Sequence, residues 1–304
     1  MSDQLATLLA AGERAAFHGR PAAGIPPLQQ AVETAHESGR DDEATAAAWL
    51  LGVALGAAGK YGSALAVLEP LADRAAVDHP ARRLFASLAA STAASVHRQL
   101  GRHAAARILD EQAESLAGDA PEALFDARLG LAADAVGLDD GTAARTRLEQ
   151  ATVLLEGRTD WWRQRVRMLW VRAEIALLPG GDPAAAVKAA ETAVTLAEGS
   201  GAPRHVAKSL LFLGVAQVQA GDPAEAAATL RRAATLSESL GCLPLVWPSR
   251  AMLGALLDGD LPQESARNLA GARGTVISIA DDLPEDLRAD WLGRPDIAAL
   301  LHGE

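Results

Sequence analysis

The sequence predicts an all-α fold, a solenoid of about seven antiparallel helix pairs followed by a C-terminal capping segment. Three observations support this prediction. Small residues recur with a period of about 40 positions along the 304-residue chain. Apolar residues between the turns fall at helical spacing. The chain is 49% hydrophobic but only 4% aromatic, so alanine and leucine, which favour helices, must supply most of the core.

A turn marks each repeat unit, and successive turns lie 38 to 42 residues apart. A small residue stands five positions after every turn. Another stands seven positions before six of the seven turns, with Glu174 as the exception. Two helices approach closely only where their side chains are small, so this pattern indicates stacked helix pairs. The turn positions are Gly19, Gly59, Gly101, Asp139, Gly181, Gly221 and Leu261.

Glycines and prolines indicate where the helices end and begin. Units five and six carry nearly the same turn, Gly-Asp-Pro-Ala at 181–184 and 221–224. In this turn glycine takes the positive φ that ends one helix, aspartate caps the next helix, and proline suits its first position. Pro26 and Pro27 lie inside the second helix of unit one, which we expect to start late or to be distorted. Further prolines fall where the first helix of a unit should begin: Pro80, Pro121, Pro203 and Pro244.

We expect one continuous repeat array over residues 3–273, because no glycine- or serine-rich linker interrupts the periodicity. The pattern changes after about Arg273. Residues 274–304 include Asp281 and Asp282, a short helical stretch, and a final turn or two that Pro295 opens. The exposed end of a repeat array needs a polar outer face, so this acidic segment is predicted to form the capping helices.

Charge and composition exclude several classes of partner. A formal net charge of −11 and a pI near 5.1 disfavour binding to the phosphate backbone of nucleic acids. Cys242 is the only cysteine, so no internal disulfide can form and a cytoplasmic location is expected. No apolar run approaches the roughly twenty residues of a membrane span, and the N-terminus lacks the basic start of a secretory signal. We therefore expect a soluble protein without membrane association; self-association is left open.

In this register the chain resembles the tetratricopeptide repeat (TPR) family. The alternation of small and large residues matches that family at Leu51-Gly52, Ala64, Leu68 and Leu71. Trp170 stands where the family consensus prefers tryptophan. The units are about 40 residues long instead of the standard 34. Such long units are similar to the C-terminal repeat regions of bacterial LuxR-type and AAA/STAND-type signalling ATPases, and residues 286–297 resemble the segment that closes those regions.

The resemblance implies a right-handed superhelix whose first helices line a concave groove. Unit four is left out because its turn lacks glycine. The same side chains would pack on one another in a tightly wound superhelix, so groove and core both stay open. The chain contains neither a nucleotide-binding domain nor a helix-turn-helix, so a regulatory role would require a partner or a longer parent polypeptide. The implied groove residues are Leu9, Trp49, Val53, Ser91, Ser95, Arg98, Met168, Val171, Ile175, Lys208, Leu211 and Val215.

The segment 161–167 has an unusual composition for an acidic, aromatic-poor chain. It contains two adjacent tryptophans and three arginines: Trp161, Trp162, Arg163, Arg165 and Arg167. Guanidinium groups bind carboxylate or phosphate bidentately, and tryptophans add stacking surface, which makes this segment a candidate anion-binding site. The alternative, which we favour from sequence, is that one tryptophan packs between units while the arginines pair with acidic helices.

Motifs for catalysis, metals or cofactors are not found. Gly59-Lys60 superficially matches a phosphate-binding loop, but Ala54 replaces its first glycine and Tyr61 its hydroxyl residue. His97 and His103 flank a turn without the spacing of a metal site. We therefore predict no catalytic residues, no metal and no cofactor.

Three functional hypotheses follow, in this order of preference. The first is a non-enzymatic scaffold that binds a protein or peptide on its concave face, in bacterial signalling or regulation. The groove mixes apolar anchors with cations, which suits an extended or helical peptide carrying acidic groups. The second is a small-molecule sensor that signals to a partner. The third is an enzyme with an unrecognised site.

Overall fold

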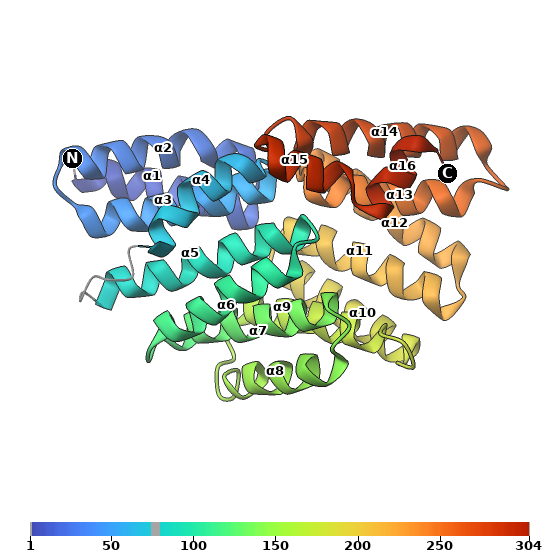
Figure 1. Ribbon diagram of the computed structural model, residues 1–304, viewed down its shortest axis with the longest axis horizontal. Coiled ribbons are helices and arrows are strands. Elements are labelled where there is room, and N and C mark those ends of the chain that lie inside the picture. The colour runs from blue at the N-terminus through green and yellow to red at the C-terminus, as the bar shows by residue number, and fades with distance from the viewer. Residues whose placement is uncertain (1, 74–79, 304) are drawn as a thin grey trace. The chain divides into compact units, whose positions relative to one another are not determined.

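The computed structural model describes residues 2–73 and 80–303. Within these residues the chain forms sixteen α-helices and no β-strand (Figure 1), which confirms the predicted all-α fold. Fourteen helices form seven consecutive pairs, and two short helices follow. The helices are α1 (Ser2–His18), α2 (Pro21–Glu37), α3 (Asp41–Ala58), α4 (Tyr61–Asp73), α5 (Pro80–Gln99), α6 (His103–Ala117), α7 (Pro121–Gly137), α8 (Gly141–Val153), α9 (Trp162–Ala176), α10 (Pro183–Gly199), α11 (Pro203–Ala220), α12 (Pro223–Leu240), α13 (Leu243–Leu257), α14 (Pro262–Ala280), α15 (Glu285–Leu292) and α16 (Pro295–His302).

The helices gather into two compact units, residues 1–157 with α1–α8 and residues 158–304 with α9–α16. These are called the first unit and the second unit below, whereas the seven helix-pair repeats keep their names unit one to unit seven. Within each unit every helix packs on the next one along the chain. The first helices of neighbouring pairs also contact each other, as α3 contacts α5 and α9 contacts α11. Each unit is thus built as a helical repeat. The division into an array over 3–273 and a cap over 274–304 stays a prediction.

Residues with a left-handed backbone conformation end several of the first helices. Gly59 ends α3 and Gly221 ends α11, both with φ of 86°, a region where only glycine escapes a steric penalty. At the fourth turn Asp139 adopts φ of 58°. Aspartate is one of the few other residues that tolerate this conformation, so the absence of glycine does not prevent the reversal.

The two turns with nearly identical sequences differ in detail. Helix α9 ends at Ala176, earlier in its unit than α11 does, and Gly180 instead of Gly181 takes the positive φ, 75°. Asp182 caps α10 by accepting a hydrogen bond from the Ala184 amide at 3.0 Å, whereas Asp222 makes no such bond to α12. The expectation of one shared turn geometry was therefore wrong, because a first helix that stops early leaves a longer loop.

The small residue seven positions before a turn makes room for a leucine of the second helix. A Cβ atom on Gly52 would lie 2.4 Å from Leu68 Cδ2, and one on Gly214 would lie 2.6 Å from Leu230 Cδ2. Both leucines are fully buried. The periodic glycines therefore mark points where the two helices of a pair touch.

In unit five the large and small residues of this contact are exchanged between the two helices. Glu174 occupies the small position in α9, and Ala190 occupies the leucine position in α10. Ala190 is fully buried and Glu174 is half-buried. The exception in the sequence pattern is compensated in the facing helix, which indicates that the two positions oppose each other in this unit as well.

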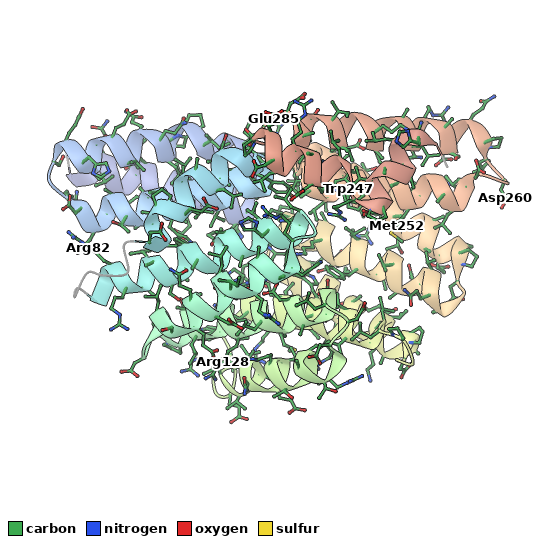
Figure 2. All side chains as sticks on the ribbon, viewed as in Figure 1. Arg82, Arg128, Trp247, Met252, Asp260 and Glu285 are labelled. Atoms are coloured by element: carbon green, nitrogen blue, oxygen red, sulfur yellow. The ribbon has the colours of Figure 1, made fainter. Side chains whose placement is uncertain are left out.

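In unit seven the repeat is displaced by one residue. Leu261 is the residue before α14, and Asp260 lies in the turn between α13 and α14 (Figure 2). Ser265 is buried and Ala266 is exposed. The small buried position is therefore filled by Ser265, and the expectation that Ala266 fills it was wrong, because α14 begins one residue earlier in its repeat than α12 does.

Pro26 and Pro27 neither delay nor break α2, so the expectation of a late start was wrong. Helix α2 begins at Pro21 and contains both prolines. Each proline removes one backbone donor. The helix nevertheless keeps the buried contacts of Gly24 and Leu28 on either side of them, and this packing maintains the helical path.

The two C-terminal helices pack on the last helix pair. Helices α15 and α16 pack on α14. Trp291 is fully buried, its Nε1 donates to the Val276 carbonyl at 3.3 Å, and its ring meets Trp247 edge-on at 5.8 Å. The Arg273 side chain donates to the Leu300 carbonyl at 2.7 Å. These contacts cover the end of the last helix pair.

Candidate functional site

The groove residues predicted for unit one and unit two are half-buried. Leu9 on α1 packs against a small core cluster that contains Leu5 and Ala44. Trp49 on α3 lies beside α5, where its ring centroid is 6.0 Å from that of Phe85. Val53 lies one helical turn after Trp49. This face of the first unit is apolar and only partly exposed.

The predicted groove arginine of α5 joins three helices. Arg98 Nη1 donates to Asp110 Oδ2 on α6 at 2.5 Å and to Asp134 Oδ1 on α7 at 2.7 Å. Both carboxylates are fully buried, and the arginine side chain is 15% exposed. Ser91 on α5 is buried and Ser95 is half-buried. We call Arg98, Asp110 and Asp134 the Arg98 triad; it stabilises the packing of α5, α6 and α7.

The Arg98 triad carries one more buried acid than it has cations. Asp110 Oδ1 and Asp134 Oδ2 are buried and have no hydrogen-bond partner among the described residues. Burial raises the pKa of Asp110 to about 7, Arg98 opposes the rise, and Asp134 adds to it. Burial also raises the pKa of Asp134, against the opposing effects of Arg98, Asp110 and His103. Gly130 provides the space that the Asp110 carboxylate occupies, since a Cβ there would collide with Asp110 Oδ2.

We expect the first unit to lose stability as the pH rises from about 5 to about 8. The folded chain holds the Asp110 proton up to a pKa of about 7, whereas the unfolded chain releases it near 3.8. The folded state therefore binds more protons in this window, and the free energy of unfolding falls with rising pH. Asp110→Asn should remove most of this dependence and be more stable than the wild type at the alkaline end.

Urea denaturation at several pH values in this window measures the effect. The matched control is Asp119→Asn, which changes an exposed acid of the same unit and should leave the slope unchanged. A wild-type stability that is flat or rises across the window would contradict the assignment.

In the second unit the predicted groove residues of α9 belong to the core. Met168, Val171 and Ile175 are each less than a tenth exposed. Leu211 on α11 packs between two core clusters, and Val215 is half-buried. The apolar stripe of α9 is therefore packing surface instead of open groove.

Aromatic rings stack across α9 and α11. The Trp170 ring lies nearly parallel to those of His205 and Phe212, with centroids 5.6 and 6.1 Å away. Trp170 Nε1 donates to Ser209 Oγ at 2.8 Å, which fixes the ring. Lys208 Nζ lies 4.6 Å above the Trp170 ring and 5.7 Å from that of Phe212, a cation–π arrangement. Phe212 and Lys208 are half-exposed, so the stack reaches the surface.

Cationic side chains surround this stack. Trp162 begins α9 and meets His205 edge-on at 5.1 Å. Burial lowers the pKa of His205 well below its ordinary value, and the nearby cations lower it further. We call the following residues the α9–α11 basic cluster: Arg163, Arg167, Arg204, His205 and Lys208.

The structure thus divides the candidate anion-binding segment. Trp162, Arg163 and Arg167 face α11, whereas Trp161 and Arg165 contact Arg158. The Arg158 guanidinium lies 4.8 Å above the Trp161 ring, and Arg165 donates to the Arg158 carbonyl at 2.9 Å. The structure therefore does not bring the five side chains together at one place.

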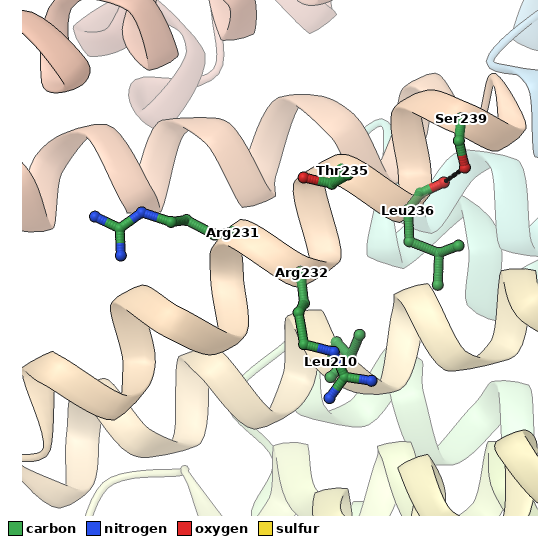
Figure 3. A pocket seen from close by; sticks show the side chains of 6 residues that line it. All are labelled: Leu210, Arg231, Arg232, Thr235, Leu236 and Ser239. Atoms are coloured by element: carbon green, nitrogen blue, oxygen red, sulfur yellow. Dashed lines mark hydrogen bonds between the residues drawn. The ribbon is translucent and has the colours of Figure 1, made fainter.

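A surface depression of about 480 Å³ lies over α11 and α12. Figure 3 shows its lining: Leu210, Arg231, Arg232, Thr235, Leu236 and Ser239. Arg231 pairs with Glu264 at 2.7 Å and Arg232 with Glu198 at 3.0 Å. Both cations are already neutralised, and no predicted groove residue lines the depression.

Sequence reasoning missed four residues that matter here. Asp110 and Asp134 complete the Arg98 triad, and Arg204 and His205 complete the basic cluster. One signal was available for Asp110, which stands at the repeat position that leucine occupies in units one, two, four and six. No comparable signal pointed to Arg204 and His205, because they approach segment 161–167 only through helix stacking.

Neither a membrane-spanning helix nor a cluster of metal ligands is found in the described parts of the chain. No helix there is long and apolar enough to cross a membrane. No three or more His, Cys, Asp or Glu side chains there are arranged to hold a metal ion. His97 is buried, with its Nε2 3.7 Å from Glu69 Oε1.

Solved structures of known proteins are similar to this fold. No family model matches the sequence, and no curated protein matches it. A signal transduction ATPase with numerous domains (STAND) protein with a TPR sensor, from Pyrococcus horikoshii, is similar in structure with a TM-score of 0.52 and 13% identity. The similarity covers 91% of this chain and 42% of that protein, so the chain spans about two fifths of its length.

A Rap protein complexed with competence and sporulation factor is similar over nearly its whole length. The TM-score is 0.51 at 12% identity, covering 100% of this chain and 96% of the Rap protein. Identities this low show the fold alone. Together with the helix pairs and their periodic small contacts, they show that the chain has a TPR-like helical repeat fold.

Proposed function

We propose that this chain is a non-enzymatic scaffold that binds an acidic segment of a protein or peptide on the first helices of its second unit. The observation that carries the proposal is the ring stack of Trp170, His205 and Phe212, with Lys208 lying over it. In a chain with only 4% aromatic residues, this gathering of rings and cations is a local concentration of the residue types that dominate protein interfaces.

Two further facts support a peptide or protein partner. A protein of the same fold was solved in complex with competence and sporulation factor. Another is described as a TPR sensor within a signal transduction ATPase, which supports a regulatory role. We also propose a cytoplasmic location, since the single cysteine is buried and unpaired.

The proposal predicts that Phe212→Ala and Lys208→Ala weaken partner binding. A partner recovered by crosslinking from lysate and then purified should bind each variant roughly 5- to 30-fold more weakly, the loss typical of an interface residue worth about 1–2 kcal/mol. Calorimetric titration measures the affinity. The matched control is Lys188→Ala, which removes an exposed lysine from α10 and should leave the affinity unchanged.

The small-molecule alternative gives a different outcome in the same experiment. Lysate filtered to remove macromolecules would raise the midpoint of thermal unfolding, and Trp170 fluorescence would respond, with no protein crosslinked. That result would replace the scaffold proposal. Equal partner affinity of wild type and Phe212→Ala would move the docking site away from the ring stack.

A further inference from the structure

The first turns of α9 and α11 lie side by side and carry cations. Trp162, the first residue of α9, contacts His205 in the first turn of α11. A helix N-terminus is the positive end of the helix dipole, where acidic residues are stabilising. Neither helix has an acidic residue in its first turn, and each has an arginine there, Arg163 and Arg204. Positive charge is therefore concentrated at this point.

Two buried nitrogen atoms at this point have no hydrogen-bond partner among the described residues. They are Arg204 Nε and His205 Nδ1. His205 is only 2% exposed. An unsatisfied buried polar group destabilises the folded state, and more strongly when the group is charged. Among the described residues, no hydrogen bond to these two atoms offsets the cost.

The surrounding charges increase the cost. Arg163 and Arg167 lie one turn apart on α9, and Arg204 and Lys208 lie one turn apart on α11, so each pair shares a helix face. Burial lowers the pKa of Arg204, and Arg163 and Arg167 lower it further. After burial, the four cations are what lower the pKa of His205.

The buried thiol of Cys242 does not supply the missing negative charge. It lies close enough to Arg204 to favour the charged guanidinium. However, burial raises the pKa of Cys242 to about 11, so at neutral pH the group is a neutral thiol. Cys242 therefore does not offset the charge of Arg204 at neutral pH.

We propose that Arg204 and His205, with Arg163, Arg167 and Lys208 around them, form a binding site for an oxyanion, a carboxylate or phosphate group. Guanidinium groups bind both bidentately, and the Trp162 ring forms one wall. The inference rests on the proposed function only in that the partner would carry the anion. The site itself is tested without any partner.

Thermal unfolding of the full chain in inorganic phosphate, acetate and chloride at matched ionic strength tests the site. We expect phosphate or acetate to raise the unfolding midpoint in a saturable way, and chloride to have no such effect. A response to both phosphate and acetate would identify a site for carboxylate and phosphate groups alike. A response to phosphate alone would identify a phosphate site. Arg204→Met should abolish the response and unfold no lower than the wild type in chloride, because it removes a cation whose buried Nε has no hydrogen-bond partner among the described residues.

The matched control is Arg172→Met, which removes an exposed arginine from α9 and should keep the full response. Nuclear magnetic resonance of the wild-type His205 ring is the second readout. A bound anion should raise the pKa of His205 toward its ordinary value, and this measurement needs no variant to fold. No midpoint shift and no change at His205 would overturn the inference while leaving the Phe212 partner experiment free to succeed.

Discussion

Arg98→Met is expected to destabilise the first unit by about 3–5 kcal/mol at neutral pH, the cost of leaving a buried charge without its partner. Arg98 is the cation that Asp110 and Asp134 contact, and both carboxylates are fully buried. Methionine keeps an unbranched apolar stem but none of the hydrogen-bond donors. Urea denaturation gives the change in unfolding free energy, and hydrogen exchange of α5–α7 assigns it to the first unit.

Two variants separate the charge effect from packing. In Arg98→Met combined with Asp110→Asn and Asp134→Asn, no buried charge is left, so a large part of the lost stability should return. Arg145→Met, an exposed arginine of α8, should change stability by no more than about 0.5 kcal/mol. A loss below about 1 kcal/mol for Arg98→Met would show that the triad is solvated and contributes little.

Gly52→Ala is expected to destabilise the chain by about 1–3 kcal/mol, the usual cost of overpacking. Alanine is the better helix former by about 1 kcal/mol, so propensity alone predicts the opposite sign. The steric contact should dominate, because the added Cβ would lie 2.4 Å from Leu68 Cδ2. Thermal or urea unfolding measures the difference.

A double-mutant cycle tests whether the two positions act as a pair. Leu68→Ala alone should cost about 2–5 kcal/mol. The double variant Gly52→Ala with Leu68→Ala should cost less than the sum, by about 0.5–3 kcal/mol. The matched control is Gly274→Ala in α14, where an added Cβ would meet nothing within 4 Å; it should stabilise the chain. Destabilisation of similar size at Gly274 would assign the effect to the backbone instead of the contact.

Local sequence determined the fold because each repeat unit is a short-range structure. The two helices of a pair are joined by a tight turn, and their contacts repeat along the chain, so glycine, proline and leucine positions suffice to define them. The prediction failed where one unit departs from the average, as at Gly181, Ala266 and the prolines of α2. Those details depend on how far an individual helix extends before its packing ends.

The candidate sites depend on contacts between units, which periodicity does not describe. The Arg98 triad draws one residue from each of α5, α6 and α7. The basic cluster joins side chains of α9 and α11 that lie more than thirty positions apart in sequence. The resemblance to TPR proteins placed Arg98 and Lys208 on first helices, but it could not show that one neutralises buried acids while the other lies over a ring.

The buried, protonated thiol of Cys242 has a practical consequence for spectroscopy. Maleimides and similar reagents attack thiolates at exposed positions, so the native side chain should react slowly. A cysteine introduced on the surface would then carry a fluorophore or spin label almost alone. Paired labels within either half of the chain could follow ligand-induced bending of the helix stack without first removing the natural residue.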